Sequence, residues 1–109
     1  MKIDDWRRKI DEIDAEMLHL LNLRTKLALK VGRSKTDEGV ALRVPAREKE
    51  ILNRLKALNQ GPLDGDAIEK IYQVIFDLSV RSQELQGNPA NGRGNRATVR
   101  GSQRKPARA

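Results

Sequence analysis

The stretch Ile3 to Lys35 carries one unbroken helical pattern, and this pattern limits what the chain can fold into. Apolar residues recur along it every three or four positions, as in a helix that packs along its whole length. A helix over residues 4–36 is about 50 Å long at ~1.5 Å per residue, longer than a compact three-helix monomer of this size can cover. Much of its apolar seam therefore needs a partner chain. The seam consists of Ile3, Trp6, Ile10, Ile13, Met17, Leu20, Leu27 and Val31.

Basic residues interrupt this apolar seam. Arg24 lies within it, Arg7 lies on the flank of the same face, and Lys35 lies one turn beyond Val31. A helix that only packs avoids such cations, because an unpaired buried charge is strongly unfavourable. An anion is therefore expected to bind here. Gly32 costs up to about 1 kcal/mol as a helix former, which indicates close packing or close approach of a ligand.

Start and stop signals predict three helices and no strands, which makes the fold class all-α. The predicted helices cover about 4–36, 45–59 and 64–86, with 36–44 as a connecting loop. Their start signals are Asp4 or Asp5 as a cap, Pro45 in a first turn, and Asp64 as a cap. The stop signal Asn59-Gln60-Gly61-Pro62 ends the second helix, and Gly87-Asn88-Pro89 ends the third.

The apolar stripes of the second and third helices also lead into polar side chains. Their apolar members are Ile51, Leu52, Leu55 and Leu58 on the second helix, and Ile68, Ile71, Tyr72 and Ile75 on the third. One turn before the second stripe lies Glu48, and the third stripe continues into Ser79 and Gln83. We therefore expect these three groups to face the interior.

Each polar position has a structural explanation when it is taken singly. Arg7 and Lys35 can reach water from near the helix ends, Ser79 can bond to its own helix backbone, and Arg24 can pair with Glu48. Together with Gln83, however, three cations, one carboxylate and two neutral hydrogen-bonding groups describe a site for a small, oxygen-rich dianion.

Helix geometry shows which of the three cations Arg7, Arg24 and Lys35 can reach the same ligand. Arg24 and Lys35 are about 20° apart around the helix and about 16 Å apart along it, so their long side chains can converge on one ligand. Arg7 lies about 25 Å from Arg24 along the axis, too far for both to hold one small molecule. If Arg7 belongs to the site, it comes from the other chain of an antiparallel dimer, which the length of the first helix also requires.

Composition limits the remaining function classes. The chain has 109 residues, no cysteine and a net charge of +7, which indicates one small domain without disulfides or thiolate chemistry. Six of its 22 basic residues lie in 87–109, so the folded part is nearly neutral and nucleic-acid binding is not favoured. That segment has the composition of a disordered basic tail, interpreted as a solubilising extension or as a nonspecific polyanion contact.

The chain shows no signal peptide or membrane span, so we expect a cytoplasmic protein.

Several motifs in order resemble the all-helical class of chorismate mutase, over essentially all of residues 4–86. They are WRRKIDEID, LLNLRTKLALKVGRSK, VPAREKEIL and DLSVRSQE. The resemblance implies three helices per chain and an intertwined antiparallel homodimer with two equivalent sites, each completed by one arginine in trans. It also implies the Claisen rearrangement of chorismate to prephenate, in phenylalanine and tyrosine biosynthesis, with no cofactor or metal.

The resemblance also implies a role for each matching residue. Arg7 from the partner chain and Arg24 match the arginines that bind the two carboxylates of chorismate, and Lys35 and Gln83 match the pair that hydrogen-bonds the ether oxygen. The remaining matches are Glu48 as acceptor for the ring hydroxyl, Ser79 as a carboxylate contact, and Arg47 as a supporting arginine. Some members carry Asp where this chain has Val44, and here that contact falls to Glu48 or the backbone.

Two other functions are compatible with this pattern. Isochorismate-pyruvate lyase shares the fold and a cationic site, and a non-enzymatic helical dimer can bind polyanions through the basic tail. Nothing after residue 86 resembles a dehydratase, dehydrogenase or synthase domain, so the expectation is a monofunctional mutase. Some mutases of this kind are activated by another enzyme of the pathway, but the sequence assigns no such partner to this chain.

Overall fold

The computed structural model describes residues 1–87, and these residues form three helices. The helices are α1 (Ile3–Glu38), α2 (Pro45–Leu58) and α3 (Gly65–Gly87). The all-helical class predicted from the sequence is confirmed over this part of the chain. Apart from residue 87, the predicted basic tail lies outside the described residues.

Local signals explain where α1 begins and ends. Asp5 accepts a hydrogen bond of 2.9 Å from the backbone N–H of Lys2, the residue at the N-cap position. Asp5 therefore stabilises the start of the helix from within the first turn, and not as the cap that the sequence suggested. At the other end, Gly39 has a φ of 73°, a left-handed conformation that favours glycine. This residue ends the helix and directs the chain into the loop over 40–44.

The other two helices begin where the sequence placed their start signals. Pro45 is the first residue of α2, where its missing N–H is not needed. Asp64 precedes α3, and its Oδ1 accepts a hydrogen bond of 2.8 Å from the backbone N–H of Ala67. Between the helices, the side chain of Asn59 donates to the carbonyl of Leu63 at 2.6 Å and closes the turn.

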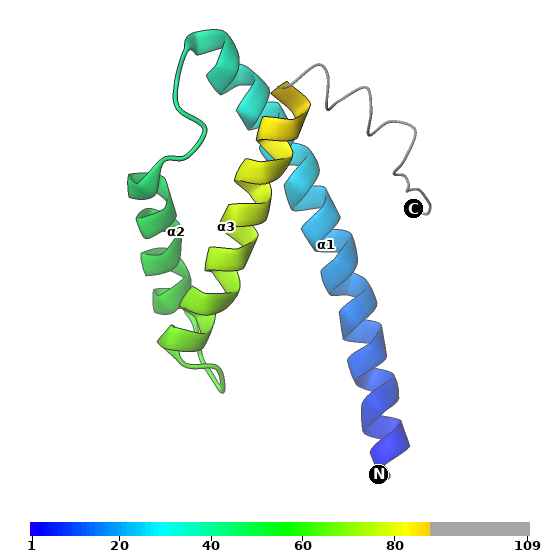
Figure 1. Cartoon of the computed structure of the whole chain (residues 1–109). Helices are drawn as coiled ribbons and strands as arrows, with labels where there is room; N and C mark the ends of the chain where they lie inside the picture. The colour runs from blue at the N-terminus through cyan, green and yellow to red at the C-terminus, as the bar shows by residue number, and fades with distance from the viewer. Residues whose placement is uncertain (88–109) are drawn as a thin grey trace.

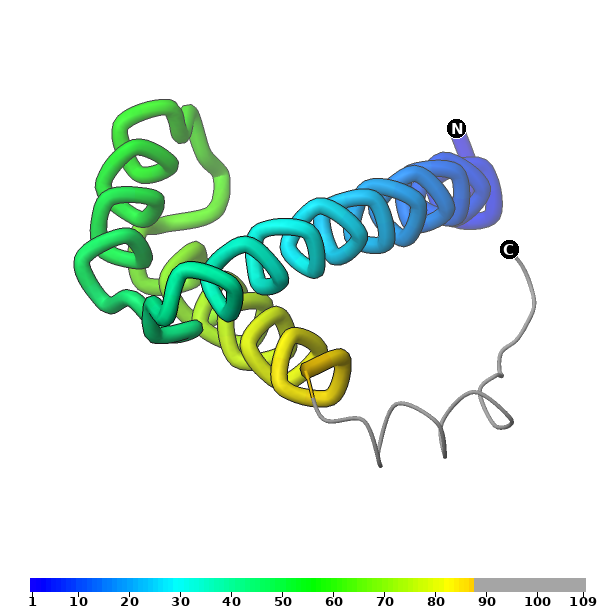
Figure 2. The backbone as a smooth tube through the Cα atoms, turned by 90° about the horizontal axis from the view of Figure 1, so that it is seen from above, coloured from blue at the N-terminus to red at the C-terminus, as the bar shows by residue number. Residues whose placement is uncertain are grey.

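Helix α3 is the central element, because it packs against both α1 and α2. Figure 1 shows α3 between the other two helices, crossing the C-terminal half of α1. The N-terminal half of α1 extends away from both, which is also plain when the chain is seen from above (Figure 2). One chain therefore covers only the C-terminal half of its long helix.

The core of a single chain is small. Its buried apolar side chains in the described residues are Ile68 and Phe76, at 8% and 3% exposure. Two residues assigned to the apolar stripes are instead exposed, Ile71 on α3 at 46% and Leu58 on α2 at 68%. Each residue turns a helix by about 100°, so a stripe centred on Phe76 turns Ile71 outwards. Phe76 was absent from the predicted stripe.

The predicted apolar seam of α1 is largely exposed within one chain. All eight of its residues are between 50% and 67% exposed, from Val31 at 50% to Ile3 at 67%. Contact with α3 comes from the neighbouring face, where Gly32 is buried and Arg24 and Ala28 are partly buried. A monomer would thus expose apolar side chains along most of α1, from Ile3 to Val31.

The described helices also bear on membrane insertion. None of them combines the length and the apolar character that crossing a membrane requires.

Candidate functional site

A cavity of about 300 Å³, the central cavity, lies between the three helices and the loop after α1. Six of the seven side chains predicted from the sequence line it. They are Arg24, Lys35, Arg47, Glu48, Ser79 and Gln83. Its apolar walls include Leu27, Val31, Ile51 and Phe76. Its volume is at the lower end of the roughly 300–1,000 Å³ of small-molecule sites.

Arg24 reaches the central cavity from the middle of α1 and is held there by α3. Its Nη1 donates a hydrogen bond of 2.9 Å to Ser79 Oγ, and its guanidinium carbon lies 5.8 Å from the ring centroid of Phe76. The π-face of this buried ring attracts the cation. One of the five N–H groups of Arg24 is used by Ser79, so the others are available to a ligand.

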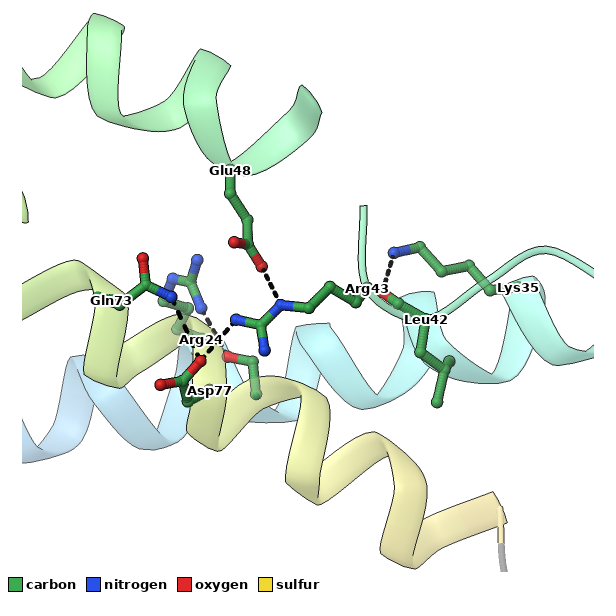
Figure 3. Close-up of polar contacts among 8 residues, drawn as sticks. Arg24, Lys35, Leu42, Arg43, Glu48, Gln73 and Asp77 are labelled. Atoms are coloured by element: carbon green, nitrogen blue, oxygen red, sulfur yellow. Dashed lines mark hydrogen bonds and ion pairs between the residues drawn. The ribbon is translucent and has the colours of Figure 1, made fainter. Parts of the chain in front are cut away.

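Glu48 is held by a residue that the sequence analysis missed. Arg43, in the loop after α1, donates from Nε to Glu48 Oε2 at 3.1 Å and from Nη2 to Asp77 Oδ1 at 2.6 Å. Figure 3 shows the Arg43 guanidinium between these two carboxylates, which come from α2 and α3. The predicted alternative, a direct pair between Arg24 and Glu48, is therefore replaced by two separate contacts. The second carboxylate of this bridge, Asp77, lies 34 residues from Arg43 in the sequence, and no sequence pattern links the two positions.

Within this bridge, Arg43 and Asp77 each shift the pKa of the other in the direction that favours the charged form. The hydrogen bond from Arg43 holds the pKa of Asp77 below its ordinary value, with a smaller contribution from Gln73. The hydrogen bonds to Asp77 and Glu48 in turn raise the pKa of Arg43. Arg43, like any arginine, is charged at neutral pH. It holds one oxygen of Glu48, while the other oxygen can accept a hydrogen bond from a ligand.

Lys35 lies at the loop end of the central cavity. Its Nζ donates a hydrogen bond of 2.8 Å to the backbone carbonyl of Leu42, as Figure 3 shows. The ammonium group has three donors, so two remain for a ligand. The same contact ties the loop to the last turn of α1.

Gln83 is the most enclosed polar side chain of the site, at 7% exposure. Its Nε2 donates a hydrogen bond of 2.7 Å to the carbonyl of Ala28 on α1. Its side chain packs directly against Gly32 of α1. The glycine that suggested close packing thus contacts a predicted site residue.

Two predicted cations lie farther out. Arg47 lines the rim of the central cavity and pairs with Glu50 on α2. Arg7 is not part of the cavity: it lies on the extended half of α1, 3.6 Å from Asp4, and its side chain is 71% exposed. Because α1 runs unbroken through both positions, Arg7 cannot fold back onto Arg24 of the same chain.

The arrangement suits an anion with several oxygen atoms. Three cations, one carboxylate and two neutral groups line the central cavity. Arg24, Lys35, Glu48 and Gln83 each make one hydrogen bond to the protein and have hydrogen-bonding capacity left over. Side chains held in this way lose little further freedom when a ligand binds, which favours both affinity and electrostatic catalysis.

Sequence comparison identifies relatives of this chain. The family model of chorismate mutase type II matches residues 6–84. The chorismate mutase of Methanocaldococcus jannaschii is 35% identical over 77 residues, which cover 70% of this chain and 78% of that protein. A bifunctional chorismate mutase/prephenate dehydratase of Aquifex aeolicus is 37% identical over 79 residues, covering 69% of this chain and 22% of that protein. The chain thus spans about a fifth of the length of such bifunctional relatives.

Solved structures give the same result. The Form II structure of chorismate mutase from Thermus thermophilus superposes with a TM-score of 0.77 at 35% identity, covering 79% of this chain and 98% of that one. The chorismate mutase of Helicobacter pylori in complex with prephenate superposes with a TM-score of 0.71 at 33% identity, covering 75% of this chain and 89% of that one. By sequence and by fold, the chain belongs to the chorismate mutase type II family.

Proposed function

We propose that this chain is a chorismate mutase, which rearranges chorismate to prephenate in the biosynthesis of phenylalanine and tyrosine. The observation that carries the proposal is the convergence of Arg24, Lys35, Glu48 and Gln83 on one cavity. Family membership and the prephenate complex of the Helicobacter pylori relative support it.

The rearrangement is pericyclic and needs no nucleophile and no obligatory proton transfer. Catalysis therefore consists of holding the compact conformer of chorismate and stabilising the charge that develops on its ether oxygen. Arg24 binds one carboxylate, assisted by the hydroxyl of Ser79, and Arg47 supports binding at the rim. The apolar walls exclude water and strengthen these ionic contacts.

Lys35 and Gln83 act at the ether oxygen. One free N–H of the Lys35 ammonium and the second N–H of Gln83 Nε2 donate to it as the carbon–oxygen bond breaks and the new carbon–carbon bond forms. A neutral amide donates without any change of protonation. Both donors are already fixed by contacts to backbone carbonyls, so little reorganisation is needed during the reaction.

Glu48 accepts a hydrogen bond from the ring hydroxyl of chorismate. Val44, where some family members have Asp, also lines the central cavity and offers no polar side chain. The hydroxyl end of the substrate therefore depends on Glu48 and on the bridge through Arg43 that orients it.

The second arginine of the site is Arg7 of a partner chain in an antiparallel homodimer. The part of the exposed apolar seam that lies outside the central cavity, from Ile3 to Leu20, is the surface that the partner covers. The position of Arg7 along α1 excludes it from its own chain's cavity. Two copies related by a twofold axis bury this seam and bring each Arg7 to the other chain's cavity.

The direct test is an assay of chorismate consumption and prephenate formation on the wild type, Arg24→Ala and Lys35→Ala. Each variant should lose about 100-fold or more in kcat/KM, the scale of removing one donor from a preorganised site. Lys30→Ala removes an exposed cation on the same helix and is the matched control, with activity near wild type. Near-normal rates in both cavity variants, or conversion of isochorismate to salicylate and pyruvate in place of mutase activity, would contradict the proposal.

A further inference from the structure

Helix α3 packs so closely against α1 at Gly32 that there is no room for a side chain there. A Cβ atom built on Gly32 would lie 2.6 Å from Gln83 Cγ and 3.0 Å from both Cβ and Cδ of Gln83. Contacts under 3.0 Å essentially never occur for real Cβ atoms. The space that any other residue would fill at position 32 is thus occupied by the side chain of Gln83.

The contact also determines how the amide of Gln83 is oriented. Its Nε2 donates to the carbonyl of Ala28, one helical turn before Gly32. A carbonyl only accepts hydrogen bonds, so the amide nitrogen must face α1. Three residues later, Gln86 repeats the arrangement by donating to the carbonyl of Leu29 at 3.0 Å. The two amides dock α3 against the backbone of one segment of α1.

This segment also carries Lys35, the other group proposed to act at the ether oxygen. Lys35 follows Gly32 by three residues on the same helix, and Gln83 is bound to the turn just before it. Both donors are therefore attached to the same stretch of α1, Lys35 through its own backbone and Gln83 through its hydrogen bond to Ala28.

We propose that Gly32 is a positioning residue for the mutase reaction: its missing side chain lets the amide of Gln83 lie against α1, at the place where the ether oxygen is bound. The proposal rests on the proposed function, because it assigns that oxygen to Gln83. A methyl group at position 32 moves the Gln83 amide away from α1 while Arg24 and Ser79 keep their contact. A shift of about 1 Å in a catalytic group is enough to cost about 100-fold in rate.

The test begins with Gly32→Ala in the full chain. We expect kcat to fall about 10- to 100-fold with KM within about threefold of wild type, since carboxylate binding is retained while a donor to the ether oxygen is displaced. Gly65→Ala is the matched control, because a Cβ on this α3 glycine meets the Lys56 side chain at an ordinary 3.6 Å. This control should keep wild-type kcat and KM.

A double variant separates positioning from a general loss of structure. Gln83→Ala removes the Cγ and Cδ atoms that crowd position 32, so Gly32→Ala should lower kcat little further in that background. Gly32→Ala should lower the midpoint of thermal unfolding, and the double variant should recover at least part of that decrease. If Gly32→Ala does not fold by itself, folding of the double variant would still show that the Gln83 side chain is what clashes with the added methyl group. If neither variant folds, the proposal is overturned.

Other outcomes are equally decisive. Wild-type kcat in Gly32→Ala, or losses that multiply when the two substitutions are combined, would overturn the role of Gly32 while leaving the mutase assignment in place. An inactive wild type would remove the proposed function and this role with it. The two failures are therefore distinguishable in one set of assays.

Discussion

Arg43 joins three parts of the molecule through a single guanidinium. It belongs to the loop after α1 and contacts Glu48 of α2 and Asp77 of α3. The side chain of Glu48 is 19% exposed, so without Arg43 its carboxylate would be partly buried and unpaired. At the scale of single residues, Arg43 thus determines where Glu48 points.

Replacing Arg43 should weaken substrate binding more than it slows the chemical step. We expect Arg43→Ala to raise KM about tenfold with kcat changed by less than about threefold, because the ring hydroxyl is bound alike in the ground and transition states. Arg54→Ala, an exposed arginine on α2, is the control for the loss of a positive charge. Steady-state kinetics with chorismate measure both constants, and an unchanged KM in Arg43→Ala would show that Glu48 holds its position unaided.

Most of the candidate site was predictable from residue type and helical spacing, but its internal contacts were not. Arg24, Lys35 and Gln83 stand out because a polar group interrupts an apolar stripe, and this signal is local. The Arg43–Asp77 contact joins positions 34 residues apart, and no periodicity links a loop arginine to an exposed aspartate. Phe76 was missed and Ile71 was wrongly assigned for a related reason: neighbouring helical faces are both apolar, and only tertiary packing decides between them.

At the scale of elements, two exposed ion pairs connect α3 to its neighbours. Lys56 on α2 contacts Glu69 on α3 at 2.7 Å, and Arg43 contacts Asp77. The hydrogen bond from Lys56 lowers the pKa of Glu69 below its ordinary value, and that from Arg43 does the same to the pKa of Asp77. The hydrogen bond to Glu69 in turn raises the pKa of Lys56 above its ordinary value. Water screens both pairs, so each contributes modestly to stability.

These directions define the pH range in which the pairs stabilise the fold. A carboxylate whose pKa is lower in the folded state than in the unfolded state stabilises the fold fully when the pH is above its unfolded-state pKa. This stabilisation is lost as the pH falls through the folded-state pKa. We therefore expect a constant thermal midpoint and constant mutase activity from pH 6 to 8, and a falling midpoint below about pH 4. Asp77→Asn should lower the midpoint at pH 7, and its difference from wild type should vanish in acid.

The measurement is thermal unfolding by circular dichroism across pH, at one fixed protein concentration because association shifts the midpoint. If the midpoints of wild type and Asp77→Asn still differ by the same amount at pH 2, the stabilisation does not come from the Arg43–Asp77 ion pair. A steep loss of activity between pH 6 and 8 would instead contradict the proposed role of Gln83, since its neutral amide does not titrate.

At the scale of the whole molecule, the chain buries too little to account for its long helix. Its buried apolar core in the described region is Ile68 and Phe76, whereas the α1 seam is at least half exposed throughout. The site and the core also coincide, because Phe76 is both the most buried of these side chains and the support of Arg24. The partner chain proposed above would complete both at once.

Mixing two inactive variants tests whether Arg7 acts across the dimer. Arg7→Ala and Arg24→Ala should each be inactive, but a mixed dimer contains one site with both arginines intact. After denaturation and refolding together, the mixture should recover about a quarter of wild-type activity, because random pairing gives about half mixed dimers with one of two sites restored. No recovery in a mixture that sedimentation shows to be dimeric would mean that Arg7 does not act in trans.

The unbroken course of α1 has a consequence for how the sequence can vary. Arg7 and Arg24 are separated by continuous helix, so the number of residues between them fixes both their spacing and their relative direction. Removing a single residue would turn one arginine by about 100° relative to the other and shorten their separation by about 1.5 Å. In the proposed dimer that change would affect both sites together. Insertions and deletions between these positions should therefore be excluded as strictly as replacement of the arginines themselves.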